Sequence, residues 1–89
     1  IDQAKYDRNL AEEFIQHKRL DEAKELLLNT KQGFEKEKLY DKLQINYKSL
    51  IRVYAKLNQL DSISLYVDKL VIVNNQLLEN LVVKQTAEL

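Results

Sequence analysis

The 89-residue sequence contains no cysteine, no proline, no methionine and no tryptophan, and it has a single glycine. Without cysteine, the chain can form no disulfide, no thiolate zinc site and no cysteine nucleophile. Without proline, and with one glycine, almost nothing in the sequence can break a helix. These absences favour one helical domain and leave the cellular compartment open.

The charge of the chain is also balanced. Fourteen basic residues offset fourteen acidic ones, so no net field attracts nucleic acid or an anionic membrane, and we expect neither as a partner. No apolar run reaches the roughly 18 residues that span a bilayer. The opening IDQAKYDRNL has no initiator Met and no apolar signal core. We therefore expect a fragment of a longer protein, which could carry a transmembrane helix elsewhere.

Apolar residues recur at helical spacing along most of the chain. Asp21 is predicted to cap a helix, Gly33 to end one, and Asn74 and Asn75 to break one, because these residue types favour such positions. The predicted elements are a first hairpin over residues 2–32, a second over residues 35–73, and a terminal helix over residues 76–89. The alternative is one uninterrupted helix over residues 61–89.

Two stretches of the chain follow the same plan. LAEEFIQHKRLDEAKELLLNT, residues 10–30, and LIRVYAKLNQLDSISLYVDKL, residues 50–70, match in their apolar pattern when shifted by forty residues. Each of these helical hairpins cannot bury its own apolar face and must stack on its neighbour. The sequence thus predicts an all-α domain of stacked antiparallel hairpins.

The pattern within each copy resembles the tetratricopeptide repeat. The matching positions in the first copy are Leu10, Ala11, Phe14, Ala23 and Leu27, and those in the second are Tyr47, Leu50, Ile51, Tyr54, Ile63 and Val67. Ile51 and Ile63 depart from the small residues that the family prefers. The resemblance implies a short superhelix with a terminal helix, whose concave face binds a protein or peptide.

The first helix of each hairpin would line that concave face. Carrying the family pattern over gives a candidate binding set of Lys5, Arg8, Glu12, Gln16, Lys48, Arg52 and Lys56. Five cations against one carboxylate favour an acidic peptide or a terminal carboxylate. The same residues are also typical of a solvated helix face, and this alternative stays open.

The tail DKLVIVNNQLLENLVVKQTAEL, residues 68–89, resembles the last repeat of sensor regions in bacterial signalling proteins of the Bacteroidetes type. The resemblance implies a signal-sensing module of a regulatory protein on the periplasmic side of the membrane. Without that resemblance, the expected compartment is the cytoplasm.

No residue pattern predicts catalysis, a metal site or a cofactor. His17 is the only histidine and lacks the further ligands that a metal needs. Ser49, Ser62 and Ser64 have no histidine or glycine turn beside them, and neighbouring carboxylates such as Glu12 and Glu13 diverge on a helix. The five tyrosines mostly fall on apolar stripes and are expected in the core. We therefore expect a non-enzymatic domain.

The end of the chain is unusually apolar for an exposed helix. Leu77, Leu78, Leu81 and Val82 are candidates for self-association into a homodimer, or for a helix that caps the second hairpin. The alternative to a ligand-binding module is therefore a purely structural domain that pairs through its C-terminal helix.

Overall fold

The computed structural model describes the backbone of residues 3–88 and the side chains of residue 3 and residues 5–82. The helices follow one another as α1 (Gln3–Gln16), α2 (Leu20–Lys36), α3 (Tyr40–Lys56) and α4 (Leu60–Glu88). Within the described backbone there is no strand. The prediction of an all-α fold is confirmed.

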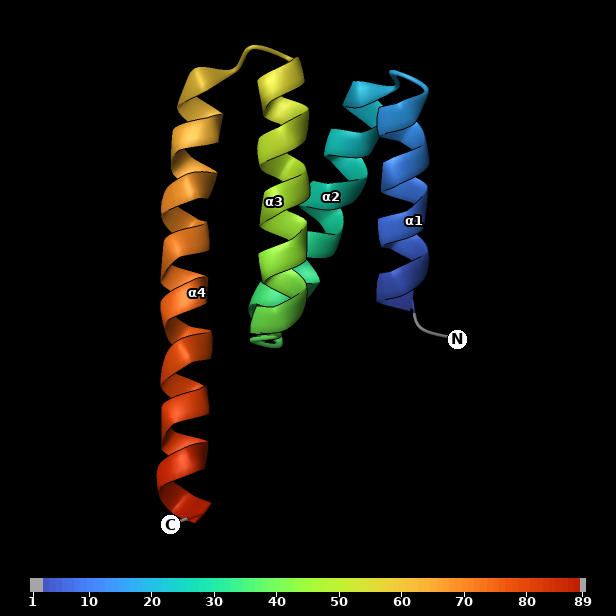
Figure 1. The fold of residues 1–89 in the computed structure, drawn as a ribbon. Coiled ribbons are helices and arrows are strands. Elements are labelled where there is room, and N and C mark those ends of the chain that lie inside the picture. The colour runs from blue at the N-terminus through green and yellow to red at the C-terminus, as the bar shows by residue number, and fades with distance from the viewer. Residues whose placement is uncertain (1–2, 89) are drawn as a thin grey trace.

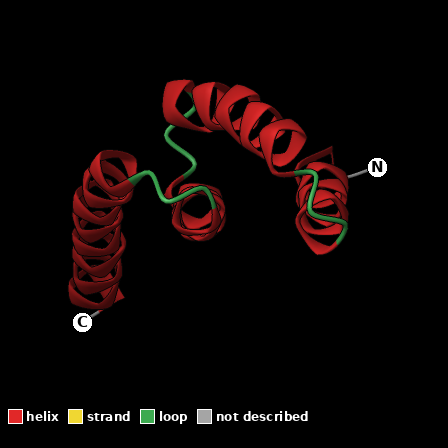
Figure 2. Ribbon diagram, turned by 90° about the horizontal axis from the view of Figure 1, so that it is seen from above, coloured by secondary structure: helices red, strands yellow, loops and turns green. Residues whose placement is uncertain are grey.

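Consecutive helices run antiparallel and pack side by side (Figure 1). Seen from above, they form an open arc in which α2 lies behind the other helices and bridges α1 and α3 (Figure 2). α1 and α3 touch each other only sparsely. The lower end of α4 extends past all the other helices (Figure 1).

The core is centred on α3. Leu50 and Val53 of this helix are fully buried, because α3 is covered by α2 on one side and by α4 on the other. Ala23 and Leu27 of α2 close the core from behind. The remaining buried apolar residues are Ala11, Ile15, Leu43, Tyr47, Tyr54, Tyr66 and Val73.

Three turns of identical geometry connect the helices. Their central residues are Lys18, Lys38 and Asn58, with φ values of 60°, 55° and 57°. This left-handed conformation is unusual for residues other than glycine, and it is common one residue after the end of a helix. The turns recur every twenty residues, which is half the period predicted from the sequence.

Each turn is closed by the same pair of backbone hydrogen bonds. In the first, the Lys18 amide donates to the Ile15 carbonyl at 3.1 Å and the Arg19 amide donates to the Phe14 carbonyl at 2.7 Å. This is the Schellman pattern, which satisfies carbonyls that a helix end leaves without partners. The guanidinium of Arg19 also lies 4.9 Å from the centre of the Phe14 ring. The turn geometry therefore comes from the backbone and an aromatic anchor, with no glycine.

The predicted helix end at Gly33 is wrong. α2 continues to Lys36, and Gly33 lies inside it without a positive φ. The turn occurs five residues later at Lys38, where the Leu39 amide donates to the Phe34 carbonyl at 3.0 Å. The first hairpin therefore extends beyond residue 32, and α3 begins at residue 40 rather than at 35.

The predicted break at Asn74 and Asn75 is also wrong. α4 is one helix of 29 residues, as the alternative interpretation held, and no separate terminal helix begins near residue 76. Burial of Val73 and packing of Leu77 against the core hold the helix straight through this region. The Oδ1 atom of Asn74 accepts a hydrogen bond from Gln44 of α3 at 2.7 Å, so this polar side chain is used without breaking the helix.

Asp21 does not cap α2 as predicted. Arg19 occupies the N-cap position and makes no side-chain cap bond, while Asp21 lies in the first turn of the helix. Asp41 and Asp61 occupy the same place in α3 and α4. A negative charge there interacts favourably with the positive end of the helix dipole.

Candidate functional site

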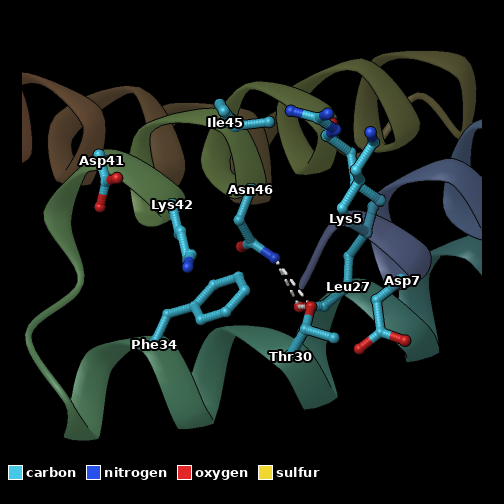
Figure 3. A pocket seen from close by; sticks show the side chains of 11 residues that line it. Lys5, Asp7, Leu27, Thr30, Phe34, Asp41, Lys42, Ile45 and Asn46 are labelled. Carbon is cyan, nitrogen blue, oxygen red and sulfur yellow. Dashed lines mark hydrogen bonds between the residues drawn. The ribbon is translucent and has the colours of Figure 1, made fainter. Parts of the chain in front are cut away.

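A cavity of about 230 Å³ lies where α1, α2 and α3 meet. Its floor is the C-terminal half of α2, represented by Leu27, Thr30 and Phe34. One wall is the N-terminal half of α3, and the other is the first two turns of α1 (Figure 3). This region is called the α1–α3 groove below. Its apolar floor and polar walls are typical of a site that binds a small ligand or one segment of a peptide.

Asn46 is the most deeply buried polar side chain of the groove, with 4% of its surface exposed. Its Nδ2 group donates to the Leu27 carbonyl at 3.0 Å and to Thr30 Oγ1 at 3.1 Å (Figure 3). These bonds use both donors of the amide and tie α3 to α2. Its Oδ1 atom has no hydrogen-bond partner. An acceptor left without a partner in a buried place costs free energy, so this amide is a local expense of the packing between α2 and α3.

The walls of the groove carry charges of both signs. Lys5 and Arg8 of α1 and Lys42 of α3 are its cations, and Asp7 and Asp41 are its carboxylates. Lys42 extends from α3 towards Phe34 on the floor (Figure 3). The net charge of the lining is one positive unit, which favours a ligand with negative charge over a cationic one.

An ion pair joins the two walls near one end of the groove. Arg52 of α3 donates to Glu12 of α1, and the two residues are forty positions apart, so they occupy equivalent places in the two hairpins. Both side chains are about half exposed, so solvent screens this pair and it contributes little to stability. The pair is one of the few contacts between α1 and α3.

The structure divides the predicted concave-face set into three groups. Lys5 and Arg8 line the cavity, and Glu12 and Arg52 form the ion pair that closes one end. The remaining members are exposed and do not line the cavity; they are Gln16, Lys48 and Lys56. The predicted set therefore overlaps the cavity only at Lys5 and Arg8, and binding by these residues stays a prediction.

Several groove residues were not predicted from the sequence. Asn46, Phe34 and Thr30 lie between the helices, whereas the predicted set was drawn from the outward faces of the first and third helices. A sequence signal for Phe34 exists, because Phe14, Phe34 and Tyr54 recur every twenty residues. Asn46 also offered a sequence signal, because it is a polar residue beside Tyr47, which belongs to the apolar stripe of α3.

A second polar cluster lies on the α2–α4 side of the core. The Tyr47 hydroxyl donates to Glu35 Oε2 at 2.6 Å, and the Nζ atoms of Lys31 and Lys69 lie 3.6 Å from the same carboxylate. Burial alone would raise the pKa of Glu35, but the Tyr47 hydroxyl and the two lysines outweigh this effect and hold that pKa below its ordinary value. Burial, followed by the hydrogen bond to Glu35, raises the pKa of Tyr47.

Glu35 therefore stays ionised and Tyr47 stays protonated near neutral pH, so neither group is poised to transfer a proton. The rings behind them support this structural role. Tyr66 lies 5.7 Å from both Tyr47 and Tyr54, and it stacks on the latter with an interplanar angle of 13°. The prediction of core tyrosines is confirmed for these three residues, whereas Tyr6 is exposed.

Among residues with described positions, no group of three or more histidine or acidic side chains could hold a metal ion. His17 is exposed in the turn after α1. In the same part of the chain, no helix combines the length and the apolar character that crossing a bilayer requires.

The predicted self-association residues lie at the C-terminal part of α4. Leu77 packs against the core, whereas Leu78, Leu81 and Val82 have more than half of their surfaces exposed. The C-terminal end of α4 extends past the end of α3 (Figure 1). These three side chains therefore present apolar surface to solvent in the described part of the helix.

Comparisons of the chain with family models, with curated proteins and with solved structures found no match. The resemblance to the tetratricopeptide repeat therefore stays a prediction from residue pattern. The two features of the molecule that bear on its function are the α1–α3 groove and the exposed apolar side chains of α4.

Proposed function

We propose that this chain is a non-enzymatic protein-interaction module that binds an acidic peptide segment in the α1–α3 groove. The observation that carries the proposal is the cavity of about 230 Å³, which combines an apolar floor with the cations Lys5, Arg8 and Lys42 in its walls. A peptide segment could pack an apolar side chain on this floor while its carboxylates meet the cations.

The size and the charge of the groove support the same class of ligand. Water occupies roughly 30 Å³ per molecule in the liquid, so the cavity has room for one or two side chains but not for a folded domain. Arg8 and Lys42 stand on opposite walls, where a carboxylate between them would gain charge-assisted hydrogen bonds. Phe34 and Ile45 would pack against the apolar part of the same segment.

The resemblance of the tail to bacterial sensor regions supports a wider role for this groove. In that role the module belongs to a regulatory protein, and occupation of the groove by a peptide or protein is the signal. Since α1 is attached mainly through α2, a ligand that bridges α1 and α3 would change how firmly α1 is held.

Fluorescence polarisation with labelled eight-residue peptides tests the proposal. Acidic peptides and their amide counterparts, in which Asp and Glu are replaced by Asn and Gln, form the matched pair of probes. We expect the acidic set to bind more tightly, and the double variant Arg8→Glu/Lys42→Glu to lose at least tenfold in affinity. Lys48→Glu/Lys56→Glu makes the same charge change outside the cavity and is the control. Equal losses in both variants, or no binding by any peptide, would contradict the proposal.

A second candidate function is a purely structural domain that self-associates through α4 and has no groove ligand. The specific observation in its favour is the apolar surface of that helix, where Leu78, Leu81 and Val82 are exposed together. Such a domain would stay paired when all peptides fail to bind.

A further inference from the structure

The exposed apolar side chains of this chain gather on one helix. Of the eleven large apolar residues that are exposed in the described part, eight belong to α4. Single apolar residues at a surface are ordinary, but a contiguous group marks a surface that another molecule covers. The eight are Leu60, Leu65, Val67, Val71, Ile72, Leu78, Leu81 and Val82.

Most of them follow the spacing of a coiled coil. Six residues succeed one another at steps of seven, four, three, four and three; they are Leu60, Val67, Val71, Asn74, Leu78 and Leu81. They are called the α4 seam. A repeat of 3.5 residues keeps a stripe facing one partner helix along its whole length, which is why it is typical of helices that pair along their axes.

The first hairpin shows what normally covers this side of the helix. Leu27 of α2 and Val67 of α4 are forty residues apart and occupy equivalent positions. Leu27 is 4% exposed because α3 lies over it, whereas Val67 is 42% exposed. The α4 seam therefore resembles a face that another helix covers, and no helix of the described chain covers it at Val67.

The dimensions of the chain agree with a missing partner. It exposes 6393 Å² of surface, while a compact monomer of its 10.5 kDa mass would expose about 5,400 Å². Its radius of gyration is 14.4 Å, against about 12 Å for a compact chain of this length. The excess of surface, about 1,000 Å², is close to the roughly 800 Å² that each partner contributes to a standard stable interface.

The length of the seam selects the partner. At about 1.5 Å per residue, the seam runs for roughly 32 Å and α4 for roughly 43 Å, whereas a 17-residue helix such as α2 or α3 is only about 26 Å long. A further hairpin with helices of that length would leave part of the seam uncovered. A second α4 covers all of it, and the zero net charge of the chain opposes no such pairing.

We propose that two copies of this chain pair in parallel through the α4 seam. The inference gives a geometry to the second candidate function and does not depend on a groove ligand. In the parallel arrangement each seam residue meets its own counterpart, so apolar layers meet apolar layers and Asn74 meets Asn74. The antiparallel register that sets Leu60 opposite Leu78 leaves Leu81 without a seam partner. The register that sets Leu60 opposite Leu81 places Asn74 against Val67, and the one that sets Val67 opposite Leu78 places it against Val71.

Asn74 supplies the polar layer of the pair. Its Oδ1 atom is held by Gln44 at 2.7 Å, so the orientation of the amide is set before the second copy arrives. A single polar layer in an apolar seam costs some affinity and fixes the alignment of two helices, because a shifted partner would bury it against apolar side chains.

Single-cysteine cross-linking of the full chain tests the pairing directly, since the natural sequence has no cysteine. A disulfide needs Cα atoms about 4.4–6.8 Å apart, which only facing residues reach. Leu78→Cys replaces a seam residue. Leu65→Cys is the matched control, because it replaces another exposed leucine of α4 about 140° round the helix.

We expect light scattering to give twice the chain mass, and Leu78→Cys to cross-link at least tenfold faster than Leu65→Cys under mild oxidation. Val71→Glu/Leu78→Glu should give a monomer with unchanged helical circular dichroism. A dimer in which Leu78→Cys fails to link, while Leu60→Cys/Leu78→Cys links, would overturn the parallel geometry and leave self-association standing. A monomer at every concentration would overturn both.

Discussion

The two hairpins of this chain share one apolar sequence pattern, but equivalent residues of their second helices differ in burial. Ala23 and Leu27 of the first hairpin are buried, whereas their equivalents Ile63 and Val67 are half-buried and exposed. Both positions are apolar in each hairpin, so the difference in burial comes from what lies over them. α2 packs between α1 and α3, while among the described helices α4 packs along α3 and meets α2 through the Lys69–Glu35 ion pair.

An apolar position in a helical array is one that a neighbouring helix covers, and that helix can belong to the same chain or to another one. Within residues 3–56 the neighbours are present, and the helices close around a core and a polar groove. Along α4 the same pattern continues without a cover. The first three helices are therefore covered within the chain, α3 by α4 itself, and the pairing proposed above would cover the exposed apolar side of α4.

The largest expected effect comes from truncating the equivalent pair. Leu27→Ala should lower the free energy of unfolding by about 2–4 kcal/mol, because it leaves a cavity under α3. Val67→Ala should change it by less than about 0.5 kcal/mol at concentrations where the chain is monomeric, since this side chain is largely in water. Chemical denaturation measures both changes. Equal losses of stability would mean that Val67 is covered within the chain, and they would contradict the difference in burial between the two hairpins.

A second pair of equivalent positions is Tyr6 of α1 and Asn46 of α3. Asn46→Ala removes two buried hydrogen bonds and should cost about 1–3 kcal/mol. Tyr6 is 58% exposed, so Tyr6→Ala should cost much less. Thermal unfolding followed by circular dichroism compares the two variants. A larger loss for Tyr6→Ala would show that α1 contributes more to the core than its packing indicates.

Gly33→Ala gives an effect of opposite sign. Nothing lies within 4 Å of a Cβ atom added at this position, and alanine in a helix interior is favoured over glycine by about 1 kcal/mol. We therefore expect a more stable protein by that amount in urea titration. If Gly33 instead ended the helix in a left-handed conformation, the same change would destabilise the chain. Lys38→Gly is the complementary variant and should be neutral or stabilising, because the strained position is there.

The smallest expected effect concerns Glu35, which links α2 to Tyr47 and to Lys69 of α4. Its folded-state pKa is lowered, so its contribution to stability is present above the ordinary carboxyl value of 4.5 and is lost as the pH falls through the lowered value. Because about a third of the side chain is exposed, the contribution should stay below about 1 kcal/mol.

Glu35→Gln keeps an acceptor for the Tyr47 hydroxyl and removes the charge. We expect it to be slightly less stable than the natural chain at neutral pH and equal to it in strong acid, as measured by urea unfolding across that range. A stability difference that grows towards acid would contradict the assigned direction of the pKa shift.

The sequence allowed the helices and their apolar faces to be predicted, because apolar residues at helical spacing mark the face on which a helix packs. It did not allow the helix ends to be placed from residue type. Gly33 and Asn74 are residues that often end helices, yet the turns lie at Lys18, Lys38 and Asn58, where backbone hydrogen bonds stabilise the left-handed residue. The sequence signal for these turns was the recurrence of an aspartate three residues after each left-handed residue, at Asp21, Asp41 and Asp61.

The groove could be predicted only in part for a related reason. Outward-facing cations such as Arg8 and Arg52 follow from helical spacing, but the depth between helices depends on how far α1 stands from α3. Asn46 and Phe34 meet there through tertiary packing that no local pattern describes.

Hydrogen exchange of the backbone amides at two protein concentrations, one below and one above the onset of pairing, tests most directly whether α4 is completed by a second chain. The account predicts that amides of residues 78–88 gain strong protection at the higher concentration, while those in the middle of α2 and α3 are protected at both. Rapid exchange of residues 78–88 at both concentrations would contradict it.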